Sequence, residues 1–110
     1  APDVAFVSWD RIPERKMPTE PIPGLTPDLA IEVLSESNTK AEMERKRRDY
    51  FDAGTKLVWE VDPDARTVAV FEGASESRTL SASESLAAPI LLPGFAMSLA
   101  DLFAELDRQG

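Results

Sequence analysis

The sequence contains no cysteine and no histidine among its 110 residues. Without cysteine there is no disulfide, zinc ribbon, iron–sulfur cluster or thiol nucleophile, and we expect a protein of a reducing, cytoplasmic compartment. Without histidine there is no Ser-His-Asp triad and no imidazole base. Any metal ion must therefore be held by oxygen atoms, which leaves magnesium, manganese and calcium as candidates.

Long apolar runs are also missing. No segment approaches the roughly 18 apolar residues that a membrane-spanning helix needs, and the first residues lack the pattern of a signal peptide, so we expect no membrane partner. The length predicts a single domain over residues 1–110. The chain starts as if a strand were already under way, without an initiator methionine, and we expect that the beginning of the domain is missing.

The distribution of apolar residues predicts an α/β sandwich built around a mixed sheet. The expected elements are strands at 3–8 and 28–35, and a helix at 40–53 that Thr39 caps and Gly54 ends. A β-hairpin follows, with a strand at 57–62 that alternates with period two and a strand at 67–71. A strand at 78–80 and a last helix that Ser98 caps complete the set. A proline-rich loop at 10–27 separates the first two strands, and the small, polar residues at 81–88 predict a mobile stretch.

Glu32 is the first candidate for a functional residue because it interrupts the apolar strand at 28–35. A buried carboxylate costs several kcal/mol unless it is paired or binds a cation. Two other interpretations remain open, namely that Glu32 lies at a sheet edge and points to solvent, or that a buried arginine neutralises it.

Lys46 is the second candidate. The apolar stripe of the helix at 40–53 runs through Met43, either Lys46 or Arg47, and Tyr50. The lysine stem can lie over apolar surface while its ammonium group reaches water. Alternatively the ammonium group meets Glu32, because a helix that follows a strand after a short turn packs back across the sheet.

Asp3 is the third candidate, as a partner of Glu32 in a metal site. Asp28 and Glu32 are four residues apart on one strand, which corresponds to roughly 13 Å at about 3.3 Å per residue, so they cannot share one ion. Neighbouring strands are only about 4.8 Å apart, which makes Asp3 the better partner. Asp28 is expected to end the loop or to cap the entry to the strand.

Several sequence motifs occur together in this chain. They are Pro2-Asp3, the strand from Pro27 to Ser35, Lys46-Arg47-Arg48-Asp49-Tyr50, Ala53-Gly54, the strand from Leu57 to Pro63, and Leu92-Pro93-Gly94-Phe95 before the last helix. In combination they resemble the Uma-type putative restriction endonuclease family of the PD-(D/E)XK nuclease superfamily. The resemblance implies a restriction-endonuclease-like sandwich, a central mixed β-sheet flanked by helices, here lacking the N-terminal helix and first strand of the family.

The resemblance also implies a metal-dependent phosphodiesterase. In it Asp3 and Glu32 would bind Mg²⁺ or Mn²⁺ together with the Val33 carbonyl, and Asp3, Glu32 and Lys46 would be the catalytic residues. Leu34 stands where the superfamily usually has its lysine. Lys46, on the following helix, is the position that matches the displaced basic residue.

The net charge of −8 bears on the partners. An acidic protein repels DNA, but residues 1–56 carry 9 basic and 11 acidic side chains whereas residues 57–110 carry 3 and 9. DNA contact is therefore expected from the first half, above all from the basic run at 45–48, although this run is equally interpretable as a solvated helix face.

Three functions stay open from the sequence. The first is a magnesium-dependent nuclease acting on DNA, and the second is a catalytically inactive endonuclease-like fold that serves as a DNA-contact or dimeric interaction module. The third is a structural domain without any nucleic acid. A homodimer is the expected assembly, since five large apolar residues are placed near exposed edges. These are Trp59, Phe71, Leu91, Leu92 and Phe95.

Overall fold

A computed structural model describes residues 4–6, 26–75 and 77–109 of the chain. Asp3 and nearly all of the proline-rich loop expected at 10–27 lie outside the described residues. Within them, no helix is both long enough and apolar enough to cross a membrane.

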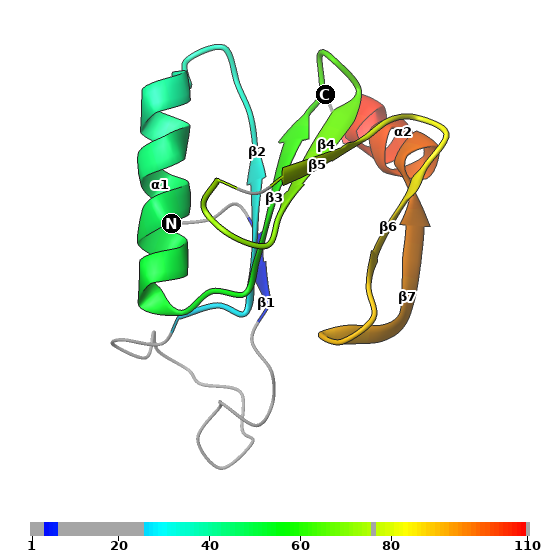
Figure 1. Ribbon diagram of the computed structural model, residues 1–110. Coiled ribbons are helices and arrows are strands. Elements are labelled where there is room, and N and C mark those ends of the chain that lie inside the picture. The colour runs from blue at the N-terminus through cyan, green and yellow to red at the C-terminus, as the bar shows by residue number, and fades with distance from the viewer. Residues whose placement is uncertain (1–3, 7–25, 76, 110) are drawn as a thin grey trace, which may run out of the picture.

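The described residues form a mixed α/β structure (Figure 1). In chain order the elements are β1 (Val4–Phe6), β2 (Leu29–Val33), α1 (Lys40–Ala53), β3 (Leu57–Asp62), β4 (Thr67–Phe71), β5 (Ser77–Leu80), β6 (Ser85–Ala88), β7 (Leu92–Ser98) and α2 (Leu99–Gln109). The first five strands form one sheet in the order β1-β2-β3-β4-β5, and β6 pairs with β7 in a second sheet. Only β2 and β3 run parallel among these strand pairs, so the central sheet is mixed, as predicted.

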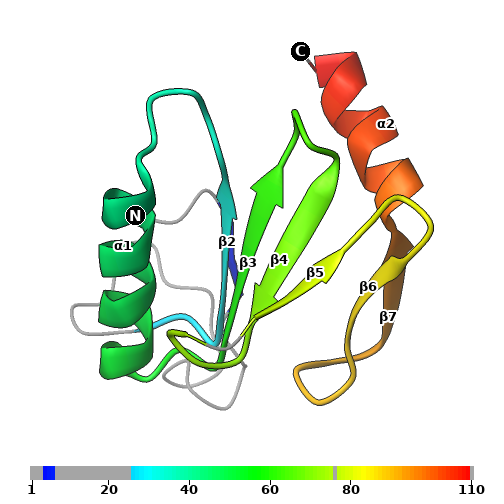
Figure 2. The same cartoon turned by 45° about the horizontal axis from the view of Figure 1, so that its top comes forward.

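The five-stranded sheet is covered on both faces (Figures 1 and 2). Helix α1 lies on one face, because it connects the parallel strands β2 and β3 and must cross over the sheet. The β6–β7 hairpin and α2 lie on the other side, where Leu86, Leu99 and Phe103 pack against Leu29 and Trp59. The central strands are thus buried on both faces, and β3 shows a run of four buried residues instead of an exposed alternate face.

The ends of α1 follow the signals in the sequence. Thr39 caps the helix, its Oγ1 accepting a hydrogen bond from the Glu42 amide at 3.1 Å. The Glu42 carboxylate accepts a hydrogen bond from Asn38 Nδ2 at 2.9 Å. Gly54 ends the helix with φ of +110°, a conformation that favours glycine. Helix α2 begins in the same way, with Ser98 Oγ accepting from the Asp101 amide at 3.1 Å.

Two expectations are wrong. The stretch at 81–88, expected to be mobile, contains β6, because Leu86 and Ala88 alternate with exposed neighbours and are buried against the central sheet. Trp59 and Phe71 do not lie at exposed edges, since both are buried within the chain. Of the residues invoked for a homodimer, Phe95 is exposed, and the homodimer stays a prediction.

Candidate active site

Two carboxylates lie side by side on the parallel strands at the centre of the sheet. Glu32 on β2 and Glu60 on β3 are register partners. Ala30 and Val58, two residues before them, form the buried cluster against which Tyr50 of α1 packs. Because strand side chains alternate, both glutamates face α1 as well. They are only 5% and 7% exposed, so helix α1 covers two buried acids.

Glu32 is held by two donors from α1. Lys46 Nζ lies 3.5 Å from Glu32 Oε2, and the Tyr50 hydroxyl donates to Glu32 Oε1 at 2.8 Å. The predicted contact between Glu32 and Lys46 is therefore present. The sheet-edge alternative is wrong, because β2 lies between β1 and β3. Among the described residues, the cation next to Glu32 is this lysine and not an arginine. The Lys46 side chain is nevertheless 37% exposed, so it contacts the carboxylate while part of it stays open to solvent.

Glu60 has a partner of its own, the guanidinium group of Arg47. Arg47 Nη1 donates to Glu60 Oε2 at 2.6 Å, and Arg47 Nε donates to the Ala74 carbonyl at 3.3 Å. The guanidinium also stacks 4.0 Å from the centre of the Phe71 ring. Only 12% of the Arg47 side chain is exposed. Arg47 is therefore largely buried, and it does not contribute to the DNA contact expected from the basic run at 45–48.

The sequence analysis overlooked Glu60, although the signal that singled out Glu32 applies to it equally. Glu60 stands between Trp59 and Val61 in an apolar strand. It was hidden by the expectation that this strand alternates between a buried and an exposed face, which would have placed Glu60 in solvent.

Asp28 occupies the opposite end of β2. It is almost fully buried, and its Oδ1 accepts from Lys56 Nζ at 3.3 Å. Its amide donates to the Phe6 carbonyl, and its own carbonyl accepts from the amides of Lys56 and Leu57. These bonds tie the start of β2 to the strands on either side, in agreement with the interpretation that Asp28 marks the entry to the strand.

The predicted metal ligands are described only in part. Asp3 lies outside the described residues. Glu32 contributes a buried carboxylate, and Val33 is the register partner of Val61 at the end of the parallel pair. Within the described part of the chain no three acidic side chains gather to form a metal site. The Glu32 carboxylate is an oxygen ligand of the kind that a hard cation takes, and a metal site would need a further carboxylate beside it.

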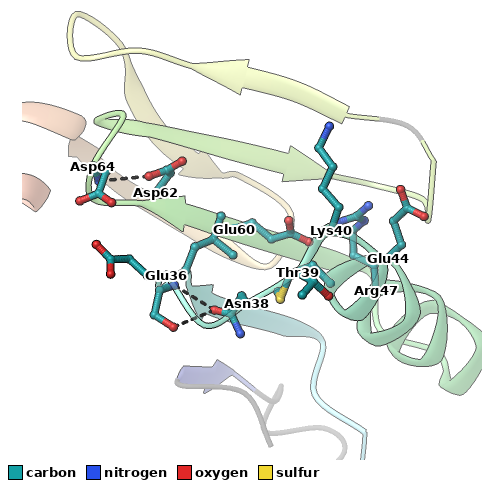
Figure 3. A pocket seen from close by; sticks show the side chains of 12 residues that line it. Glu36, Asn38, Thr39, Lys40, Glu44, Arg47, Glu60, Asp62 and Asp64 are labelled. Atoms are coloured by element: carbon teal, nitrogen blue, oxygen red, sulfur yellow. Dashed lines mark hydrogen bonds and ion pairs between the residues drawn. The ribbon is translucent and has the colours of Figure 1, made fainter.

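A cavity of about 440 Å³ opens beside this cluster, at the carboxyl ends of β2 and β3 (Figure 3). Open α/β sheets usually bind ligands at such an edge. Its lining includes Arg47 and Glu60 but neither Glu32 nor Lys46, and its charged side chains are mainly acidic. They are Glu36, Glu44, Glu60, Asp62 and Asp64 against Lys40 and Arg47. The cavity therefore does not suit a phosphate group.

A mixed sheet with helices on both of its sides is the architecture of the restriction-endonuclease-like class of α/β sandwiches. The family model of the Uma2 putative restriction endonucleases matches residues 1–100, and the chain belongs to this family. No curated protein matches it.

A solved structure is similar over most of the chain. It is a putative nuclease belonging to DUF820 from Anabaena variabilis ATCC 29413, with 27% sequence identity and a TM-score of 0.77. The match covers 96% of this chain and 60% of the Anabaena chain. The present chain thus corresponds to less than two thirds of that protein.

Proposed function

We propose that this chain supplies the active site of a magnesium-dependent nuclease that hydrolyses phosphodiester bonds of DNA. The observation that carries the proposal is the environment of Glu32. A carboxylate in the central strand of a sheet, 5% exposed and contacted by a lysine and a tyrosine from one helix, is costly to retain for stability alone. Membership in a family of putative restriction endonucleases supports a chemical role for that carboxylate.

Asp3, Glu32 and the Val33 carbonyl are the proposed ligands of Mg²⁺ or Mn²⁺. Support for Asp3 comes from its neighbour in the sequence, since Val4 is the register partner of Ile31, which directly precedes Glu32. A bound Mg²⁺ ion would supply Lewis-acid stabilisation of the negative charge that develops on a phosphodiester. The protein's own contribution is to hold the buried Glu32 carboxylate in place on a central strand of the sheet.

Lys46 is the proposed catalytic cation. Its ammonium group contacts Glu32 at one side and is open to solvent at the other, so it can orient an attacking water or donate to a phosphate oxygen. Leu34, at the position where the superfamily usually has lysine, continues the sheet, its amide donating to the Val61 carbonyl at 2.8 Å. The helix therefore supplies the positive charge that the strand does not.

A second candidate function is a catalytically inactive endonuclease-like module that contacts DNA or a second copy of the chain. The charge distribution favours it. The net charge is −8, and the cavity next to the glutamates is lined mainly by carboxylates. Both features weaken the attraction of a nucleic acid.

Nicking of supercoiled plasmid DNA by the full-length protein in Mg²⁺ separates these functions. We expect the wild-type protein to nick the plasmid and Glu32→Gln to abolish nicking. Glu36→Gln is the matched control, because Glu36 is an exposed carboxylate after the same strand, and it should retain activity. Wild-type protein that does not nick in either Mg²⁺ or Mn²⁺ would support the inactive module, and equal rates for wild type and Glu32→Gln would remove Glu32 from the site.

A further inference from the structure

Helix α1 presents two different donors to one carboxylate. Lys46 and Tyr50 are four residues apart, so they lie on the same face of the helix, one turn from each other. The Glu32 side chain lies between them, with Oε1 bonded to the Tyr50 hydroxyl and Oε2 next to the Lys46 ammonium group. Each oxygen of the carboxylate therefore has its own partner.

The two contacts differ in length and in how firmly the donor side chain is held by its surroundings. The 2.8 Å distance from the Tyr50 hydroxyl is ordinary for an O–H···O bond, and such bonds are stronger when the acceptor is ionised. Tyr50 also packs against the buried cluster of Ala30, Val58 and Phe71, which fixes its ring. The Lys46 contact is 3.5 Å long and belongs to a partly exposed, flexible side chain. Tyr50 is thus the firm contact and Lys46 the loose one.

We infer that Tyr50 is a positioning residue that fixes Oε1 of Glu32, so that Oε2 is presented to a divalent cation. This inference rests on the proposed function. A neutral hydroxyl suits the task because it orients the carboxylate while leaving its negative charge available to the cation. A second ammonium or guanidinium group at position 50 would compete with the metal for that charge.

Calorimetric titration of the full-length protein with Mn²⁺ tests the inference without relying on activity. Tyr50→Phe removes one oxygen atom and keeps the ring that packs against the sheet. We expect the Mn²⁺ dissociation constant to rise about tenfold, as is common when a hydrogen-bond partner of a metal ligand is removed. Thr55→Val is the matched control. It also removes a buried hydroxyl, one that has no hydrogen-bond partner among the described residues, and it should change the dissociation constant less than about twofold.

A purely structural role for Tyr50 predicts a different result. Tyr50→Phe would then lower the urea midpoint of unfolding but leave the Mn²⁺ dissociation constant at the wild-type value, and this would overturn the inference. In the nicking assay, a positioning role raises the Mn²⁺ concentration needed for half-maximal rate more than it lowers the rate at saturating Mn²⁺.

The outcomes separate this inference from the nuclease proposal. Mn²⁺ binding that weakens in Tyr50→Phe, without nicking by any variant, would support the role of Tyr50 and overturn the nuclease. Nicking by the wild type with unchanged Mn²⁺ affinity in Tyr50→Phe would overturn the role of Tyr50 alone. Wild-type protein that binds no Mn²⁺ would overturn the role of Tyr50 as well.

Discussion

Replacing Lys46 by methionine separates a catalytic lysine from one that only stabilises the fold. Methionine keeps the apolar stem and removes the charge. Removing one partner of a fully buried ion pair typically costs about 3–5 kcal/mol, whereas an exposed pair contributes about 0–1 kcal/mol. Lys46 is 37% exposed and 3.5 Å from its partner, and Glu32 retains its bond to Tyr50. We therefore expect Lys46→Met to lower the free energy of unfolding by only about 1–2 kcal/mol.

Arg47→Met is the matched control, because it makes the same substitution at the next residue. Arg47 is 12% exposed, lies 2.6 Å from Glu60 and stacks on Phe71. Its loss leaves Glu60 buried without its cation, so we expect a cost of about 3–5 kcal/mol. The predicted order of stability is wild type, then Lys46→Met, then Arg47→Met.

Urea unfolding and plasmid nicking together decide the matter. Lys46→Met should fold and yet lose its Mg²⁺-dependent nicking, which a lysine with a structural role alone would not explain. If Lys46→Met proved less stable than Arg47→Met, the ranking of the two pairs by burial and distance would be refuted. If Lys46→Met nicked the plasmid at the wild-type rate, the catalytic role of Lys46 would be refuted.

Three further predictions concern the cap, the DNA contact and the assembly. Thr39→Ala should lower the free energy of unfolding by about 1 kcal/mol in urea, because Thr39 caps α1; no change would mean that the cap does not matter. Replacing both exposed arginines, Arg45 and Arg48, by alanine should reduce the slope of the logarithm of the DNA association constant against the logarithm of the salt concentration by about 2. An unchanged slope would mean that these two arginines do not contact DNA. Light scattering of this chain should give a particle of twice 12.1 kDa, and a monomer at micromolar concentration would contradict the homodimer.

The best-predicted parts of the fold are those with strong local signals. Thr39 and Gly54 mark the two ends of α1, and the structure places the helix between them. The contact between Glu32 and Lys46 was also predictable, because the connection from a strand through a short turn to a helix leaves the helix one place to pack. The packing of the helix across the sheet was predictable from the connection. The helical spacing alone did not decide which residue lies on the buried stripe, because it left Lys46 and Arg47 as alternatives.

The hairpin of β6 and β7 was not predictable in the same way. Its first strand is short and built from serine, alanine and one leucine, so its alternation is faint. Its second strand contains Pro93 and Gly94, residues that normally argue against a strand. The hairpin forms because Leu86 and Ala88 bury themselves against the central sheet, a long-range contact that no local pattern reveals.

The pairing of Glu60 with Arg47 depends on the topology of the sheet, which cannot be read from the sequence of a single strand. Parallel pairing places Glu60 in register with Glu32, so two like charges meet on one face of the sheet. Helix α1 supplies two cations at successive positions, Lys46 and Arg47. Successive helix residues point about 100° apart, so one cation is directed to β2 and the other to β3. Because Arg47 is committed to Glu60, Phe71 and Ala74, it anchors the rotation of the helix, and Lys46 is left with a loose contact and access to solvent. Arg47 thereby contributes mainly to stability, whereas the proposed catalytic role falls to Lys46, which is why the same substitution at positions 46 and 47 should have different consequences.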